Sequence, residues 1–214
     1  IMRRNRLPTI TVHADQKSGL ASTLRDRIAG QIESIELPPG YRMEWGGEHG
    51  NSGDAQKALA RAVPPFVLLM VLAVILLFNS LRLTLIIWMT VPLAIIGIVA
   101  GLLIFQQPFG FMALLGALSL AGMLVKNAIV LIDEIRAQLK TGKAAWDAVV
   151  DASVSRVRPV SLAALTTVLG LLPLVPDVFF GAMAVTIAVG LLFATVLTLF
   201  VVPVLYVTFF RLRS

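Results

Sequence analysis

Long apolar runs separated by short polar turns occupy the chain from residue 63 onward. Each run is close to the roughly 20 residues that a helix needs to cross a bilayer. The pattern predicts five transmembrane helices, over residues 63–79, 84–105, 109–135, 159–175 and 179–210. Prolines interrupt the last two runs, which membrane helices tolerate when neighbouring groups satisfy the freed carbonyls.

The N-terminal part of the chain has shorter and more polar segments. Residues 7–14, LPTITVHA, are rich in β-branched side chains and predict a strand. Residues 20–35 place apolar side chains on one helix face, with Ser18 as the N-cap. After an LPPG turn, residues 41–45 predict a second strand. Residues 1–46 are therefore expected to form one βαβ unit of a larger α/β domain.

Two connecting segments carry predictions of their own. Residues 47–62 are expected to form a glycine-rich hinge followed by a polar helical lead into the first span. Residues 143–154 place Trp146, Val149, Val150 and Val154 at helical spacing. This pattern fits a short amphipathic helix on the inner membrane surface. It fits a solvated connector helix equally well.

The distribution of basic residues predicts how the spans are oriented. Loops on the cytoplasmic side of a membrane protein carry an excess of Lys and Arg. The turns at 106–108 and 176–178 carry none. The opposite side carries eight, namely Arg82, Arg136, Lys140, Lys143, Arg156, Arg158, Arg211 and Arg213. We therefore expect a multi-pass protein of the bacterial inner membrane with a periplasmic N-terminal piece and a cytoplasmic C-terminus.

Composition narrows the class of protein further. Apolar residues make up 57% and charged residues 14% of the 214 residues, and mean hydropathy is +0.88, which is typical of a membrane protein. The net charge of +6 is spread along the chain, so nucleic acid is not an expected partner. The absence of cysteine excludes disulfides and thiol nucleophiles. His13 and His49 are isolated, and we predict no metal site. No P-loop is present to power the protein by nucleotide hydrolysis.

Lys126 is the residue in the spans that most needs an explanation. An ammonium in hydrocarbon costs about 2.5–3.5 kcal/mol on insertion scales. Lys126 lies roughly 9–14 Å from the inner end of its helix, too deep for its stem to reach water unless the helix tilts. Asp133 is seven residues away, about 10 Å along the axis. We expect a functional ion-pair or proton site whose carboxylate lies outside this sequence. The alternative is a structural lysine that snorkels inward.

The segment SRVRPV contains the other candidate residues. Pro159 is expected at the first position of the fourth helix, so that Arg156 and Arg158 flank its start. Arg158 is interpreted as an anchor for the helix end. Hydroxyl groups such as that of Thr166 usually bond to a carbonyl one turn back. No substrate-binding residue can be identified.

Three segments in order carry a resemblance to a known family. They are GMLVKNAIVLIDEI at 122–135, RVRPVSLAALTTVLGLLPL at 156–174 and VTIAVGLLFATVLTLFVVPVLYVTFF at 185–210. Together they resemble the C-terminal end of a resistance–nodulation–division permease, most closely the hydrophobe/amphiphile multidrug efflux (acriflavine-resistance) branch. The resemblance implies a polytopic α-helical membrane fold. It makes residues 1–46 part of a periplasmic porter subdomain, and the five spans the last five of twelve.

The resemblance also implies a mechanism and partners. Such proteins are secondary transporters rather than enzymes. They exchange hydrophobic or amphiphilic compounds for protons, need no cofactor, and work as homotrimers with a periplasmic adaptor and an outer-membrane channel. Two aspartates in their N-terminal half pair with a lysine that corresponds to Lys126. The family arginine corresponds to Arg156. The family threonine falls at Ala163, so Thr166, one turn further, is the candidate replacement.

Two alternatives remain open at the level of sequence. The first is a transporter of the same superfamily with other cargo, such as metal ions, lipids or protein. The second is a non-transporting membrane scaffold or sensor in which Lys126 only packs. An upstream half with two adjacent intramembrane aspartates would favour transport.

Overall fold

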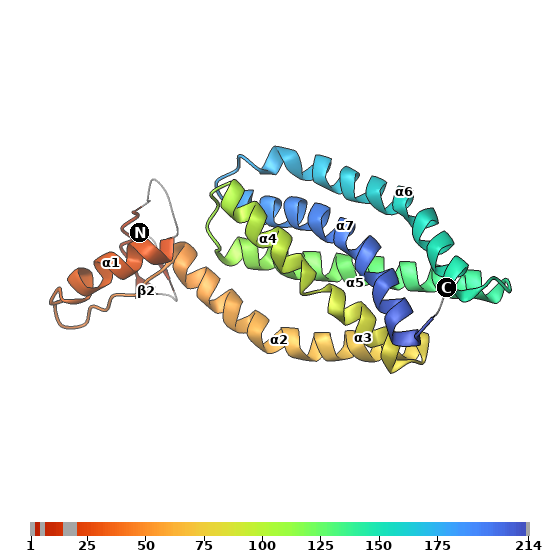
Figure 1. The fold of residues 1–214 in the computed structure, drawn as a ribbon. Coiled ribbons are helices and arrows are strands. Elements are labelled where there is room, and N and C mark those ends of the chain that lie inside the picture. The colour runs from red at the N-terminus through yellow and green to blue at the C-terminus, as the bar shows by residue number, and fades with distance from the viewer. Residues whose placement is uncertain (1–2, 5–6, 15–20, 213–214) are drawn as a thin grey trace. The chain divides into compact units, whose positions relative to one another are not determined.

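The computed structural model describes residues 3–4, 7–14 and 21–212. The chain falls into two compact units, Ile1–Ala58 and Leu59–Ser214, each described by itself. Figure 1 follows the elements from the N-terminus to the C-terminus.

Before residue 47, the described residues of the N-terminal unit form one helix and one short strand pair. Helix α1 covers Ala21–Glu33, within the predicted range. Strands β1 (Arg3–Arg4) and β2 (Leu7–Pro8) pair antiparallel. Trp45 holds the following segment against α1, since its indole N–H donates to the Glu33 carboxylate at 2.9 Å and its ring lies 5.5 Å from the Arg25 guanidinium carbon.

The predicted βαβ unit is not present in the described residues. Only Leu7–Pro8 of the expected first strand is extended in a sheet, and residues 41–45 form no strand. β-Branched and aromatic residues favour a strand, but a strand also needs a neighbour to accept its backbone hydrogen bonds. No strand is described beside 41–45. The predicted Ser18 cap lies outside the described residues.

The predicted hinge is helical instead. Helix α2 covers Gly47–Phe78, so residues 47–53 belong to the same helix as the polar lead-in. Gly47 has a left-handed φ of 68°, which glycine adopts at no steric cost where a chain turns into a helix. Glycine inside a helix is less favourable than alanine by about 1 kcal/mol, a cost that a long helix tolerates.

Among the residues that the structure describes, five helices are long and apolar enough to cross a membrane, which confirms the predicted number of spans. They cover Ser52–Phe78, Leu81–Ile104, Phe111–Lys140, Ala145–Leu174 and Gly181–Phe210. The second is broken into α3 (Leu81–Thr90) and α4 (Leu93–Ile104) at Pro92, which has no N–H to continue the helical bonds. Helix α5 covers Phe111–Lys140, and α7 covers Gly181–Phe210.

The fourth span and the predicted loop helix are one helix. Helix α6 runs over Ala145–Leu171 and ends in the 3-10 turn η1, Leu172–Leu174. Pro159 lies inside α6, so its predicted place at the first helical position is wrong. Apolar contact explains the continuity, because Ala148, Val149 and Ala152 are buried before the proline. Trp146, Val150 and Val154 are exposed.

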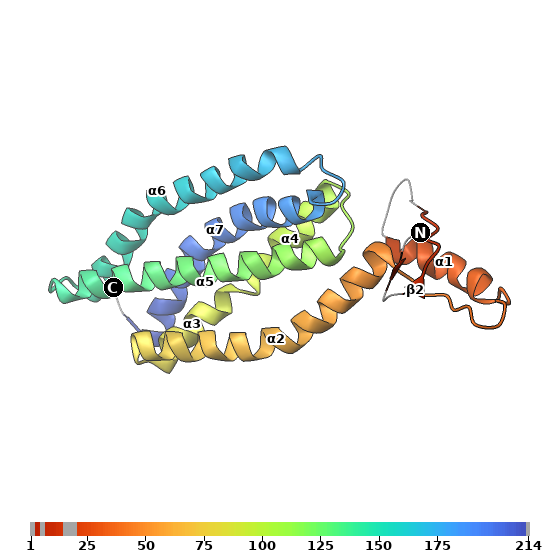
Figure 2. The ribbon, with the colours of Figure 1, turned by 180° about the vertical axis from the view of Figure 1, so that it is seen from behind.

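Helix α7 lies at the centre of the C-terminal unit, between α4, α5 and α6 in both views (Figures 1 and 2). In the most apolar 18-residue stretch of α7, 56% is buried, whereas in that of Ala145–Leu174 only 6% is buried. Glycines allow the close approach. A Cβ on Gly97 of α4 would lie 2.7 Å from the Cβ of Phe193 and 3.0 Å from the Cα of Gly190 on α7. Gly97 therefore has a packing role at the α4–α7 contact.

We predict that Gly97→Ala destabilises the helix bundle by about 1–3 kcal/mol, the range for inserting a methyl group into a well-packed core. The atoms that it meets are too close to the α7 backbone to move aside. Gly170→Ala is the matched control, because nothing lies within 4 Å of its added Cβ. It should be neutral or stabilising by up to about 1 kcal/mol, since alanine is the better helix former. Unfolding in mixed detergent micelles measures both. Equal destabilisation by the two variants would contradict the packing argument.

Candidate functional site

Lys126 lies on the exposed face of α5. Ser119, Gly122 and Asp133 share that face and are also exposed. The opposite face packs into the bundle through Leu120, Leu124, Val125, Ala128, Leu131, Ile132 and Ile135. The four helices around α5 therefore bury its apolar side and leave its polar stripe uncovered.

Lys126 forms no ion pair with any residue that the structure describes. Asp133 is its nearest carboxylate along α5, seven residues and about 10 Å further on. This separation is beyond the reach of a direct salt bridge. On α5, the residues from Met123 to Ile132 that flank Lys126 are all apolar except Asn127.

Arg156 binds a different residue of α5. Its guanidinium forms an ion pair with Glu134 at 2.5 Å, with side-chain exposures of 31% and 20%. Gln138 donates a hydrogen bond to the other Glu134 oxygen at 3.1 Å. Glu134 lies eight residues, or about 12 Å, beyond Lys126. The structure therefore does not bring Arg156 and Lys126 together, and Arg156 joins α5 to α6.

Sequence reasoning missed Glu134. Its neighbour Asp133 drew attention because it lies on the same helix face as Lys126. A signal was available in the spacing of Glu134 and Gln138, since residues four apart lie side by side on a helix. The tertiary contact with Arg156 could not be obtained from spacing.

The remaining predicted residues, Arg158 and Thr166, belong neither to the surroundings of Lys126 nor to the Glu134–Arg156 pair. Arg158 is exposed within α6, about 20 Å along the axis from its start at Ala145, so it does not flank a helix N-terminus. Thr166 is exposed, and its hydroxyl donates to the Ala163 carbonyl at 3.0 Å. The Thr167 hydroxyl donates to the same carbonyl at 2.8 Å. The expected bond to a carbonyl one turn back is present for both.

No group of three or more metal-binding side chains of the His, Cys, Asp or Glu type occurs among the described residues. His13 is exposed, and the side chain of His49 lies outside the described set.

The family model described as the AcrB/AcrD/AcrF family matches residues 1–210. The chain belongs to this family. The prediction of a resistance–nodulation–division permease is confirmed at that level. Membership and the five apolar helices together make the chain part of a multi-pass membrane protein.

Relatives within the AcrB/AcrD/AcrF family differ in their named cargo. The nickel and cobalt resistance protein CnrA of Cupriavidus metallidurans is 38% identical over 87% of this chain and 18% of its own length. The multidrug resistance protein MdtC of Edwardsiella ictaluri is 31% identical over 92% of this chain and 20% of its own length. The chain thus spans about a fifth of the length of the curated relatives it matches.

A solved structure supports the same AcrB/AcrD/AcrF assignment. The crystal structure of a heavy metal efflux pump, form II, superimposes with a TM-score of 0.68 at 29% identity. It covers 89% of this chain and 19% of the pump chain. The arrangement of the helices around Lys126 and the Glu134–Arg156 pair therefore lies in a fold that an experimental structure shares.

We predict that Glu134 and Arg156 stabilise the bundle cooperatively. A double-mutant cycle with Glu134→Gln and Arg156→Gln should give a coupling energy of about 1 kcal/mol, because the pair is only partly exposed. Lys143 and Asp151 form the control pair at 2.7 Å, with exposures of 43% and 52%. Their coupling should stay below about 0.5 kcal/mol. Unfolding in mixed micelles gives both values. No coupling between Glu134 and Arg156 would contradict a stabilising contact.

Proposed function

We propose that the chain is part of an efflux transporter driven by protons, and that Lys126 is its counter-charge. The observation that carries this proposal is the exposed ammonium on the polar stripe of α5, which pairs with no carboxylate that the structure describes. An ammonium in hydrocarbon is stable only beside an anion or water. We infer that a carboxylate outside these 214 residues covers the stripe and pairs with Lys126.

Proton binding at that carboxylate would remove its charge. Lys126 would then lack a counter-ion and move toward another polar group. Because the buried face of α5 packs tightly, such a movement would displace the helix rather than the side chain alone. Arg156 and Glu134 would carry the displacement to α6. Thr166 would join the proton relay by exchanging the hydrogen bond that its exposed hydroxyl donates to the Ala163 carbonyl.

The cargo that the relatives favour is a divalent metal cation. CnrA, at 38% identity, is named for nickel and cobalt resistance, and the superimposed structure is that of a heavy metal efflux pump. Hydrophobic or amphiphilic compounds are the second candidate, because MdtC is named for multidrug resistance. A metal cargo would be bound by residues other than the described ones, since no cluster of three His, Cys, Asp or Glu side chains occurs among them.

The working assembly would follow that of the family. We propose a homotrimer in the bacterial inner membrane with the N-terminal piece on the periplasmic side. A periplasmic adaptor and an outer-membrane channel would complete the export path. The eight basic residues on one side of the spans support this orientation.

Replacing Lys126 tests the coupling role. In the full-length protein, Lys126→Ala should reduce efflux to that of cells without the transporter, because the paired carboxylate loses its counter-charge. Lys126→Arg distinguishes two roles, since arginine keeps its proton in proteins. Retained efflux would mean that charge alone matters, and lost efflux would mean that lysine geometry or proton release matters.

Lys143→Ala is the matched control, because Lys143 lies in a loop and pairs with an exposed aspartate. It should pump like the unaltered protein. All variants must be compared at equal abundance in the membrane. Normal efflux by Lys126→Ala would exclude the coupling role and leave the snorkelling lysine.

A second measurement tests the cargo. Cells that carry the full-length protein should tolerate raised nickel, cobalt or zinc, and Lys126→Ala should abolish that tolerance. Tolerance to hydrophobic dyes should change little. If dye tolerance rises and metal tolerance does not, the second candidate replaces the first.

A further inference from the structure

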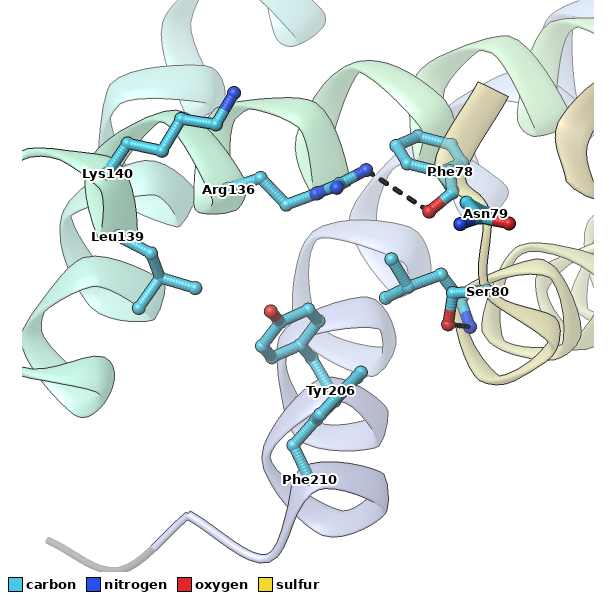
Figure 3. A pocket seen from close by; sticks show the side chains of 9 residues that line it. Phe78, Asn79, Ser80, Arg136, Leu139, Lys140, Tyr206 and Phe210 are labelled. Carbon is cyan, nitrogen blue, oxygen red and sulfur yellow. Dashed lines mark hydrogen bonds between the residues drawn. The ribbon is translucent and has the colours of Figure 1, made fainter. Parts of the chain in front are cut away.

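An open pocket of about 460 Å³ lies at one end of the membrane bundle. It forms where the turn between α2 and α3 meets the C-terminal ends of α5 and α7 (Figure 3). All of its lining residues belong to the C-terminal unit. By the distribution of basic residues, this end of the bundle is the expected cytoplasmic end.

The pocket has an apolar floor. Phe78, Leu83 and Tyr206 line it and are only 3%, 4% and 5% exposed. Leu139 and Phe210 add half-buried apolar walls. The Tyr206 and Phe210 rings stack with their centroids 4.6 Å apart. A surface of this kind attracts hydrocarbon rather than a free ion.

The rim of the pocket is cationic and polar. Arg136 and Lys140, one turn apart on α5, provide the two charges, and Asn79 and Ser80 provide neutral polar groups. None of the lining residues is acidic. Neither Arg136 nor Lys140 forms an ion pair with any described residue. Both charges are therefore available to an external anion.

Arg136 is already aimed into the pocket. One of its terminal nitrogens donates to the Phe78 carbonyl at 3.4 Å, and its guanidinium carbon lies 5.6 Å from the centre of the Phe78 ring (Figure 3). Asn79 adopts a left-handed φ of 47° at this turn, which asparagine tolerates. A guanidinium has five N–H donors, so most of them remain free for a second acceptor.

From this combination we infer that the pocket binds the phosphate of an anionic phospholipid. Arg136 would bond the phosphate oxygens through paired N–H donors, and Lys140 would add a second charge. The apolar floor would take the start of an acyl chain. Basic pockets between helices on the cytoplasmic side of membrane proteins are suited to such headgroups. The inference stands apart from the proposed function, because the pocket does not include Lys126.

The test uses the full-length protein, stripped of lipid in detergent. Phosphatidylglycerol, phosphatidylcholine and inorganic phosphate are titrated separately, and native mass spectrometry counts what is bound. We expect saturable binding of phosphatidylglycerol and a clear preference over phosphatidylcholine. Arg136→Gln with Lys140→Gln should reduce that preference by roughly 30-fold, since each basic residue near an anionic headgroup contributes about a factor of five.

Arg82→Gln with Arg158→Gln is the matched control. It removes two basic residues from the same expected side of the membrane, neither of which lines the pocket. It should keep the preference for phosphatidylglycerol. Equal loss in the two double variants would overturn the site in favour of a diffuse surface charge. Inorganic phosphate that displaces phosphatidylglycerol at similar concentration would overturn the lipid in favour of a free anion.

A measurement on the unaltered protein covers the case in which the Arg136 variant fails to fold. A photoactivatable phosphatidylglycerol with its reactive group near the headgroup should label peptides that contain residues 78–83, 136–140 or 206–210. The phosphatidylcholine analogue should label them at least several-fold less. Labelling by the two probes at equal levels in these peptides would overturn the inference.

Discussion

Close contact between α7 and its neighbours is the constraint on which the membrane bundle depends. In a bilayer, apolar side chains gain little from leaving the lipid for a protein interior, so helices associate through tight packing of small residues. Gly97 and Gly190 meet across the α4–α7 contact, and a methyl group on Gly190 would lie 2.4 Å from the end of Leu120 on α5. Leu120 lies on the buried face of α5, so this contact is made by the face opposite the polar stripe that carries Lys126.

The sequence predicted the membrane spans well because lipid imposes a composition on each span separately. A helix satisfies all of its backbone hydrogen bonds internally, so its stability in the membrane does not depend on distant residues. The N-terminal unit obeys a different rule. A segment such as 41–45 becomes a strand only beside another strand, and no local pattern reveals whether that neighbour is present. The prediction that Pro159 begins a helix was wrong for a similar reason. Buried contacts of Val149 and Ala152 extend α6 through the proline.

The candidate site divides in the same way. Lys126 could be found from sequence because the cost of an ammonium in hydrocarbon is intrinsic to its position. The Glu134–Arg156 pair joins residues 22 apart in sequence, and only the packing of α5 against α6 brings them together. The pocket around Arg136 combines three separate segments and gave no signal in any one of them. Properties of one helix are therefore readable from sequence, whereas properties shared between helices are not.

Pro159 removes one backbone hydrogen bond of α6 beside the ion pair that joins this helix to α5. Proline has no N–H, so the carbonyl of Ser155 loses its helical partner, and that carbonyl lies in the peptide that leads directly into Arg156. Both views show α6 changing direction as it leaves its N-terminal third (Figures 1 and 2). A helix bends most easily where one of its backbone hydrogen bonds is absent. A change of direction in α6 is therefore least costly three residues beyond Arg156, the residue that the ion pair with Glu134 holds against α5.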